Sequence, residues 1–445
     1  MLQKKTMDTV ESRATEFPTP LPAGMVSSSQ PRWGLPLRIG FRFLFLYLVL
    51  FSLFTQILDG LFPIPSIDIP ELGELPPFRN VVSWTAAHIF HAGTPLVYSD
   101  TGSGDRTFDW VLIFCLLMIS VAGTAVWSAM DRKRPHYISL HKWFQLGLRF
   151  AVGSEFLLYG VIKLAKLQMP FPPLAKLVEP FGDFSPFSVL WFSIGSAPAY
   201  EMFVGCAEIF GAILLFFPRT ATFGALVCLA DAIEVFVLNM TYDVPVKLTS
   251  FHLVMMSAVL LAPELRRMAS FFFTDRVTAP STLPQLFRTT RANRIALVTQ
   301  VTFAVFLTVM NGIEVRLRWY QYGGGAPKSP LYGIWNVDPG TPESHTWRRV
   351  IFDNPRFVQF QRPDDSFATF AVTVNIDAGT VTLTKPADQK WGARFDFQRV
   401  AAGEMTLSGE MDGAPLRLQL HLRERSQLML ISRGFHWVQE RPFGR

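Results

Sequence analysis

Ionisable side chains recur at helical spacing inside long apolar segments of this sequence. Glu155, Tyr159 and Lys163 stand at i, i+4 and i+8, which places them on one face of a helix. Charged residues are costly inside a membrane and usually face a bundle interior or an aqueous cavity. Four consecutive segments supply such groups, and we expect them to share one polar pocket, formed by Glu155, Tyr159, Lys163, Glu201, Glu208, Asp231, Glu234 and His252.

The residue types in this pocket are suited to proton exchange. Five carboxyl groups face one lysine and one histidine, so they cannot all be ionised in a medium of low dielectric constant. An unpaired ammonium would cost at least about 2.5–3.5 kcal/mol at mid-membrane, so Lys163 needs a partner, and Glu208 is expected, with Glu201 as the alternative. As a hypothesis, Lys163 or His252 binds a quinone carbonyl, while the glutamates carry protons. Alternatively, these groups only hold helices together, at about 0.6 kcal/mol per contact.

The composition indicates that membrane helices position these groups. Of the 445 residues, 49% are hydrophobic and only 17% are charged, whereas soluble domains carry about 25% charged residues. A wholly soluble enzyme is therefore nearly excluded. The net charge of +6 is spread between apolar runs, which favours a membrane over nucleic acid as the partner. The three cysteines also fall inside apolar runs, so neither a disulfide framework nor a metal-binding cysteine pair is expected.

The apolar runs predict about seven transmembrane helices, because a bilayer core needs about 20 apolar helical residues. Residues 1–40 are expected to be a disordered cytoplasmic tail, and 41–313 the transmembrane domain. The loops between the fourth, fifth and sixth helices are short, so these helices should be antiparallel neighbours. The predicted spans are Phe41–Phe62, Trp110–Met130, Phe144–Leu164, Pro198–Phe217, Thr220–Asn239, Ser250–Ala262 (starting earlier) and Ile295–Ile313.

The distribution of basic residues predicts the orientation. With the N-terminus in the cytoplasm, the inner segments carry 16 Lys and Arg and the outer loops carry 5, which agrees with the positive-inside rule. Seven crossings then place the chain from Glu314 onward outside. We therefore expect a multi-pass protein of the cytoplasmic (inner) membrane, with its polar pocket in the outer half of the bundle.

The pattern changes after Gly323–Gly325, where the alternation of apolar and polar residues becomes that of strands. We expect a linker over 314–330 and, over 331–445, an extracytoplasmic all-β domain that is an antiparallel barrel or sandwich. The opening Gly333-Ile334-Trp335 and the late Arg433 resemble those of lipocalin-like barrels, in which Trp and Arg pack across the closed end. The expected strands are Val350–Phe352, Phe357–Gln361, Phe367–Ile376, Val381–Thr384, Phe395–Val400, Met405–Met411, Leu416–Leu422 and Leu428–Ile431.

Two segments within the helices resemble the DoxX family. RFAVGSEFLLYGVIK contains Arg149, Gly160 and Lys163, and GCAEIFG contains Glu208 and Gly211, at the family's pattern positions. The segments NMTYDVPVK (239–247) and GSGD (102–105) are similar to those of larger DoxX-like bacterial membrane proteins. The resemblance implies a four-helix bundle over 144–268 and, from some members, a subunit linked to quinone reduction.

Two function classes follow from these observations. The first is a quinone-linked membrane oxidoreductase component or subunit, without an intrinsic cofactor, in which the pocket in the outer half binds a quinone head group. The second is a non-catalytic membrane anchor whose β-domain binds a lipid, a hydrophobic ligand or a partner subunit. No nucleic-acid partner and no metal site are expected. His88 and His91 are interpreted as part of an interfacial helix over Val81–His91, because isolated histidine pairs are weak signals of metal binding. Bound quinone would favour the first class, and a hollow apolar barrel the second.

Overall fold

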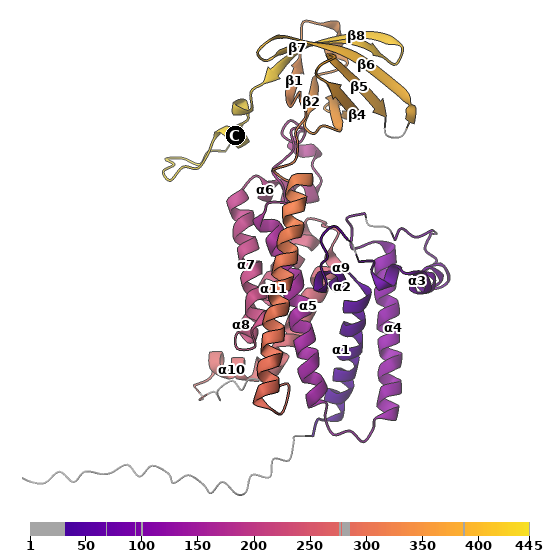
Figure 1. The fold of residues 1–445 in the computed structure, drawn as a ribbon, viewed down its shortest axis with the longest axis vertical. Helices are drawn as coiled ribbons and strands as arrows, with labels where there is room; N and C mark the ends of the chain where they lie inside the picture. Colours follow the sequence, from indigo (N-terminus) through magenta and orange to yellow (C-terminus); the bar gives the residue numbers. More distant parts are fainter. Residues whose placement is uncertain are drawn as a thin grey trace, which may run out of the picture.

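The computed structural model describes residues 32–67, 69–93, 95–98, 101–275, 277, 285–385 and 388–444. It consists of a bundle of long helices and a β-barrel beyond one end of that bundle, called here the barrel end (Figure 1). The predicted fold class, a polytopic helical membrane bundle followed by an all-β domain, is confirmed. Most of the expected disordered tail (residues 1–31) lies outside the described residues. Its last part is helical instead, because α1 already begins at Leu35.

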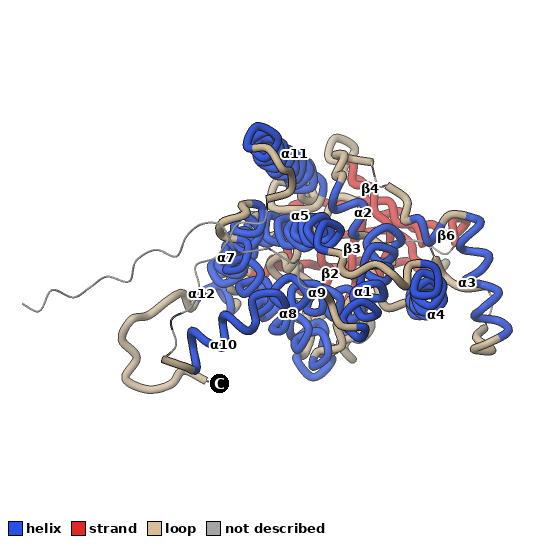
Figure 2. The backbone as a smooth tube through the Cα atoms, turned by 90° about the horizontal axis from the view of Figure 1, so that it is seen from below, coloured by secondary structure: helices blue, strands red, loops and turns tan. Residues whose placement is uncertain are grey.

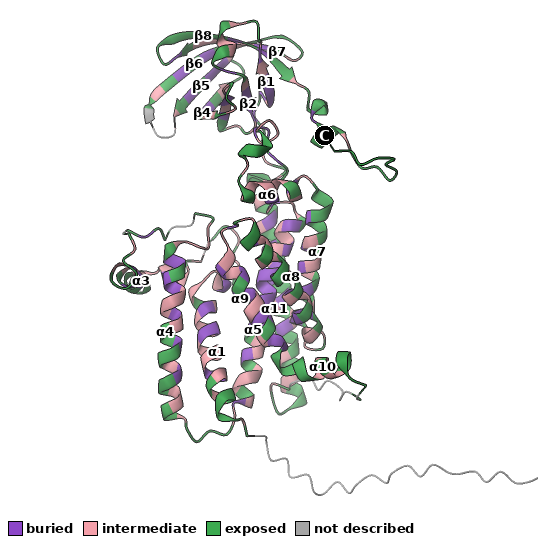
Figure 3. Cartoon of the chain, turned by 180° about the vertical axis from the view of Figure 1, so that it is seen from behind, coloured by how far each residue is buried: buried purple, intermediate pink, exposed green. Residues whose placement is uncertain are grey.

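Six helices of the described chain are long and apolar enough to cross a membrane. α5 (Ile138–Leu164) is equally long and lies among them, but it carries the charged face predicted above. Seen from the end in Figure 2, α5 is enclosed by other helices, and Figure 3 shows that the outer sides of α4 and α8 are exposed. The six are α1 (Leu35–Phe54), α4 (Thr107–Met130), α7 (Pro198–Phe216), α8 (Ala221–Thr241), α9 (Lys247–Leu261) continued by α10 (Leu265–Phe273), and α11 (Thr290–Gln321).

Two expected boundaries are wrong, and one expected loop contains a helix. The first span breaks at Thr55, whose extended backbone ends α1, and a short α2 (Ile57–Leu61) follows. The last span continues to Gln321, supported by an ion pair between Glu314 and Arg318 one turn apart, so the expected linker over 314–330 shortens to 322–330. The outer loop 165–197 contains α6 (Pro186–Gly195), whose first turn is capped by Ser185.

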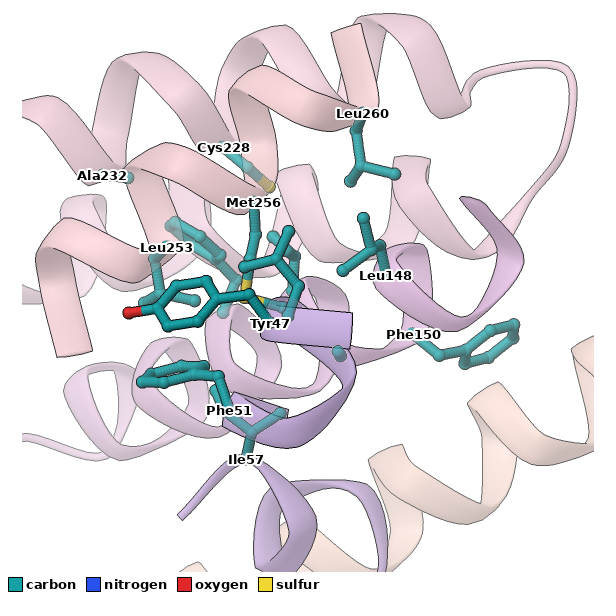
Figure 4. Close-up of a cluster of buried hydrophobic side chains, with 14 of the residues drawn as sticks. Tyr47, Phe51, Ile57, Leu148, Phe150, Cys228, Ala232, Leu253, Met256 and Leu260 are labelled. Atoms are coloured by element: carbon teal, nitrogen blue, oxygen red, sulfur yellow. The ribbon is translucent and has the colours of Figure 1, made fainter. Parts of the chain in front are cut away.

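An apolar core holds the helices together. Phe51 of α1, Leu148 of α5, Cys228 of α8 and Met256 of α9 meet in one buried cluster (Figure 4). Two short helices lie at the edge of this core and contribute few side chains to it. α3 (Pro76–His88) is peripheral, with Trp84 57% exposed and stacked on His88. α10 lies across the end of the bundle opposite the barrel (Figure 1).

The β-domain is a closed barrel in which each strand pairs antiparallel with its neighbours in sequence, and β1 pairs with β8. The turn between β7 and β8 has positive φ angles at Asp412 and Gly413, as the Asp-Gly pair predicts for a two-residue hairpin. The strands are β1 (Gly333–Val337), β2 (Arg349–Phe352), β3 (Phe357–Gln361), β4 (Phe367–Asn375), β5 (Thr380–Lys385), β6 (Asp388–Ala401), β7 (Glu404–Met411) and β8 (Ala414–Arg423).

Side chains fill the interior of the barrel. Phe352, Phe360, Phe395 and Leu383 are at most 1% exposed, which leaves no water-sized space beside them. Two expectations fail at the C-terminal end. The segment Leu428–Ile431 lies after the barrel has closed and forms part of a short helix, α12 (Met429–Ser432), rather than a strand. Arg433 does not cross the closed end of the barrel, because its guanidinium lies over Phe443, 4.1 Å from the ring centroid.

The barrel is docked on the loop between α5 and α6 as well as tethered by its linker. Leu174 and Ala175 of this loop pack against Ile334 and Ile351 of the barrel. The carboxylate of Asp353 accepts a hydrogen bond from the Leu174 backbone N–H at 2.9 Å. Burial raises the pKa of Asp353 above its usual value. The same loop therefore contacts both parts of the molecule.

Candidate functional site

Lys163 and Glu208 form the buried ion pair that the sequence predicts. Lys163 Nζ donates to Glu208 Oε1, and both side chains are at most 7% exposed. The pair depends on close contact between α5 and α7, since a Cβ at Gly160 would lie 2.9 Å from the Gly205 carbonyl oxygen. Only glycine permits this approach, and small residues at such crossings are the usual way for membrane helices to pack closely.

A cavity of about 100 Å³ lies beside this pair at the barrel end of the bundle. This is several times the space that one water molecule needs. Its walls are mostly apolar side chains of α5, α6, α7, α8 and α9, and Tyr200, which is 49% exposed, connects it to the bundle surface. Of the predicted pocket residues, five line this cavity: Tyr159, Lys163, Glu201, Glu208 and Glu234.

Three acceptor oxygens on the cavity wall have no hydrogen-bond partner among the described residues. They are Oε1 of Gln168 and Oε2 of both Glu201 and Glu208. The other oxygen of Glu201 accepts from the Met169 backbone N–H at 3.0 Å. A buried acceptor left unpaired costs about 1–3 kcal/mol. The cavity is therefore suited to a ligand that donates hydrogen bonds.

Glu155 and Tyr159 are linked by Gln56, a residue that no sequence pattern indicated. Gln56 Nε2 donates to Glu155 Oε2 and to the Tyr159 hydroxyl oxygen, at 3.0 Å each. Gln56 stands at the break between α1 and α2, so no helical spacing relates it to α5. Glu155 Oε1 has no partner within the described chain and lies against Gly60.

Tyr159 also lines a second cavity of about 370 Å³, which has a more polar wall. Thr249 and Val246 are shared between the two cavities in the same way. Tyr159 therefore stands between an apolar cavity and a polar one. Charged residues on the polar side are Asp59, Glu71, Glu74, Arg106 and Asp109.

His252 is not brought to the cavity. Its Nδ1 faces the Leu248 carbonyl oxygen at 2.7 Å, its Nε2 faces the Tyr47 hydroxyl at 2.8 Å, and its ring stacks on Phe51. One ring nitrogen is engaged within α9 and the other joins α9 to α1, so His252 is no candidate ligand for a quinone. The expectation that His252 lines the pocket with Lys163 is wrong, because its side chain faces α1 rather than the cavity.

The predicted polar residues of α8 are divided between two environments. Glu234 lines the cavity, whereas Asp231 lies outside its wall, and Asp231 Oδ2 has no partner in the described part of the chain. Asn239 donates to Ser250 Oγ at 3.0 Å and joins α8 to α9. Five of the eight residues expected in a single pocket therefore line the cavity, and the other three lie outside its wall.

The segments GSGD and NMTYDVPVK, which are far apart in sequence, contact each other in space. The two oxygens of the Asp105 carboxylate accept hydrogen bonds from the backbone N–H groups of Lys247 and Leu248, at 2.8 and 2.9 Å. Asp105 thereby caps the first turn of α9, where a negative charge is favoured by the helix dipole. The Gly104 N–H donates to the Pro245 carbonyl oxygen at 2.8 Å.

These features define a multi-pass helical membrane protein with an appended eight-stranded barrel and a mostly apolar cavity that contains three unpartnered acceptor oxygens among the described residues. No family model matches the chain. It is similar to a protein of Bacillus subtilis (strain 168) described as "Uncharacterized protein YwoB", with 28% identity over 133 residues, which cover 28% of this chain and 79% of that protein. No solved structure matches.

Proposed function

We propose that the cavity binds the head group of a quinol or quinone, and that the protein is a DoxX-like, quinone-linked component of a bacterial cytoplasmic membrane. The observation that carries this proposal is the combination of Lys163 with three unpartnered acceptor oxygens in an apolar wall. A hydroquinone brings two hydroxyl donors, which these oxygens can accept. A quinone brings carbonyl acceptors, to which Lys163 can donate.

Proton exchange would use the carboxyl groups around the cavity. Glu201 and Glu208 each have one oxygen engaged and one free of partners in the structure as described. Tyr159 and Gln56 connect this wall to the polar cavity, which offers a route to water. Cys115, Cys206 and Cys228 are free thiols on three different helices. Oxidation of a bound quinol needs an electron acceptor, which we propose is supplied by a partner subunit.

A ligand titration tests this proposal. Purified protein in detergent is titrated with a short-chain ubiquinol and, separately, with its quinone, and binding is followed by tryptophan fluorescence, since Trp191 lines the cavity. We expect Lys163→Met and Glu201→Gln to abolish or strongly weaken binding. Glu314→Gln is the matched control, because Glu314 is paired with Arg318 on a membrane helix away from the cavity. Unchanged binding by Lys163→Met would refute the proposal.

The orientation is part of the same proposal. The excess of basic residues supports a cytoplasmic N-terminus and an extracytoplasmic barrel. In a variant whose three native cysteines are replaced by serine, Ala414→Cys at the exposed β7–β8 turn should react with an impermeant thiol reagent on intact spheroplasts. Labelling only after lysis would reverse the orientation and place the cavity near the cytoplasmic side.

A second candidate function is docking of a partner subunit by the segment after the barrel. Phe435, Trp437 and Val438 are each at least 76% exposed, which is unusual for large apolar side chains unless another surface covers them. The filled interior of the barrel disfavours a hydrophobic ligand inside it. The test is a variant that lacks residues 434–445. Loss of a co-purifying subunit from this variant, while ligand binding is unchanged, would support this function.

A further inference from the structure

A recess opens at the end of the bundle opposite the barrel, beneath the turn between α7 and α8. Arg149 Nε and Nη2 donate to the carbonyl oxygens of Leu215 and Phe216, at 2.8 and 3.0 Å, so α7 ends at the level of Arg149. α5 continues past this level to Ile138, 11 residues further, which is about 16 Å of helix. The space left is a cavity of about 430 Å³ between α5, α9 and α11.

The walls of this recess carry groups that bind anions. Arg149, which is only 9% exposed, lines it together with Lys142 and His141. The first turn of α8 contributes Ala221 and Thr222, and Thr220, the N-cap residue before it, makes no side-chain cap. Uncapped N–H groups and the positive end of the helix dipole favour a phosphate at such a position. The acidic residue on the wall, Glu264, is paired with Arg267 at 2.8 Å.

An unsatisfied side chain in the same recess indicates that the ligand also donates hydrogen bonds. Gln300 is 8% exposed, lines the recess, and its Oε1 has no partner among the described residues. Its Nε2 donates to the Ala296 carbonyl oxygen of its own helix. The site thus combines cationic groups for a phosphate with an acceptor for a hydroxyl.

The surroundings place the recess at the level of lipid head groups. α10 lies across this end of the bundle (Figure 1) and carries Arg266 and Arg267 beside exposed Phe271, Phe272 and Phe273. Such an amphipathic helix is typical of the membrane interface. Leu146, Leu260 and Leu297 line the recess and supply an apolar surface for acyl chains.

We infer that this recess binds the head group of an anionic phospholipid whose head group bears hydroxyls, with its phosphate between Arg149, Lys142 and the first turn of α8. This site is separate from the cavity at the barrel end and does not depend on the proposed quinone role. Basic pockets between membrane helices are known to hold such head groups.

Native mass spectrometry of lipid-stripped full-length protein tests the assignment. The probes are phosphatidylglycerol and, for comparison, zwitterionic phosphatidylcholine. Lys142→Gln should weaken phosphatidylglycerol binding about fivefold, the effect of one basic residue near a head group, and leave phosphatidylcholine binding unchanged. Lys133→Gln is the matched control, because Lys133 is exposed in the loop before α5, outside the recess, and should bind like the wild type.

The outcomes separate lipid binding from its alternatives. Unchanged phosphatidylglycerol affinity in Lys142→Gln, or an equal loss of affinity in Lys133→Gln, would overturn the proposed site. The lipid would then be attracted by the overall positive charge of this surface rather than by the recess. Displacement of the lipid by soluble glycerol phosphate at equal concentration would overturn the lipid assignment in favour of a soluble phosphate compound. Arg149→Gln is a second variant, interpreted only if its thermal stability is retained, since Arg149 also holds the last turn of α7.

Discussion

The bundle and the barrel bury very different side chains. The buried cluster within the barrel consists of apolar residues such as Val350, Phe360 and Leu418, each at most 1% exposed. The bundle buries Glu155, Lys163 and other charged groups, several with unpartnered oxygens. Unsatisfied polar groups lower stability and persist where function requires them. The apolar core of the barrel therefore serves stability, whereas the buried charged groups of the bundle are the candidates for function.

The largest effect should come from the core of the barrel. Phe360→Ala removes a fully buried ring and should cost about 3–5 kcal/mol of barrel stability. Denaturant unfolding, followed through the fluorescence of Trp335 and Trp347, measures this change. Phe357→Ala, on the same strand but with Phe357 39% exposed, should cost far less. Loss of ligand binding in Phe360→Ala would contradict the division of roles between the two parts.

Replacing one or the other partner of the Lys163–Glu208 ion pair should lower thermal stability by unequal amounts. Glu208→Gln leaves the ammonium of Lys163 buried without its counterion, at a cost of about 2.5–3.5 kcal/mol. Lys163→Met leaves a carboxyl group that can take up a proton, so thermal stability should fall by only about 0.6 kcal/mol while ligand binding is lost. Thermal unfolding in detergent compares the two. A Lys163→Met variant that is strongly destabilised yet binds ligand normally would make the pair purely structural.

Helix contact at the site should be sensitive to a single methyl group. Gly160→Ala places a Cβ against the Gly205 carbonyl oxygen and should cost about 1–3 kcal/mol. It should also weaken ligand binding, because α5 and α7 must separate. Gly147→Ala on the same helix is the control, since nothing lies within 4 Å of its Cβ position. Equal thermal stability of the two variants would contradict the close approach.

The smallest effect concerns pH at the contact between barrel and bundle. Because burial raises the pKa of Asp353, the folded contact binds a proton more tightly than the separated parts. The contact should therefore be strongest below the ordinary pKa of an aspartate and weaken as pH rises through the raised value. Spin labels at Phe181→Cys and Ala414→Cys, in a background without native cysteines, should show a broader distance distribution at high pH. Asp353→Asn should abolish this dependence.

Sequence patterns predicted those features that depend on spacing along one element. Helical periodicity placed Lys163 on the same face as Tyr159, and the DoxX resemblance, whose pattern includes both Lys163 and Glu208, indicated Glu208 as its partner, so this pair could be predicted. Partners that depend on how elements rotate and pack could not. Gln56 reaches Glu155 only because α1 breaks at Thr55, and His252 turns toward Tyr47 rather than the cavity.

The loop after α5 has a consequence for communication within the molecule. Its Met169 N–H donates to Glu201 in the cavity wall, and five residues later its Leu174 N–H donates to Asp353 of the barrel. If ligand binding shifts this loop, the contact between the loop and the barrel changes. Coupling between two binding equilibria is reciprocal, so a partner that binds and displaces the barrel would change the ligand affinity by the same factor by which the ligand changes the affinity for that partner. Because one loop contacts both the cavity wall and the barrel, the position of the barrel would then depend on whether the cavity is occupied.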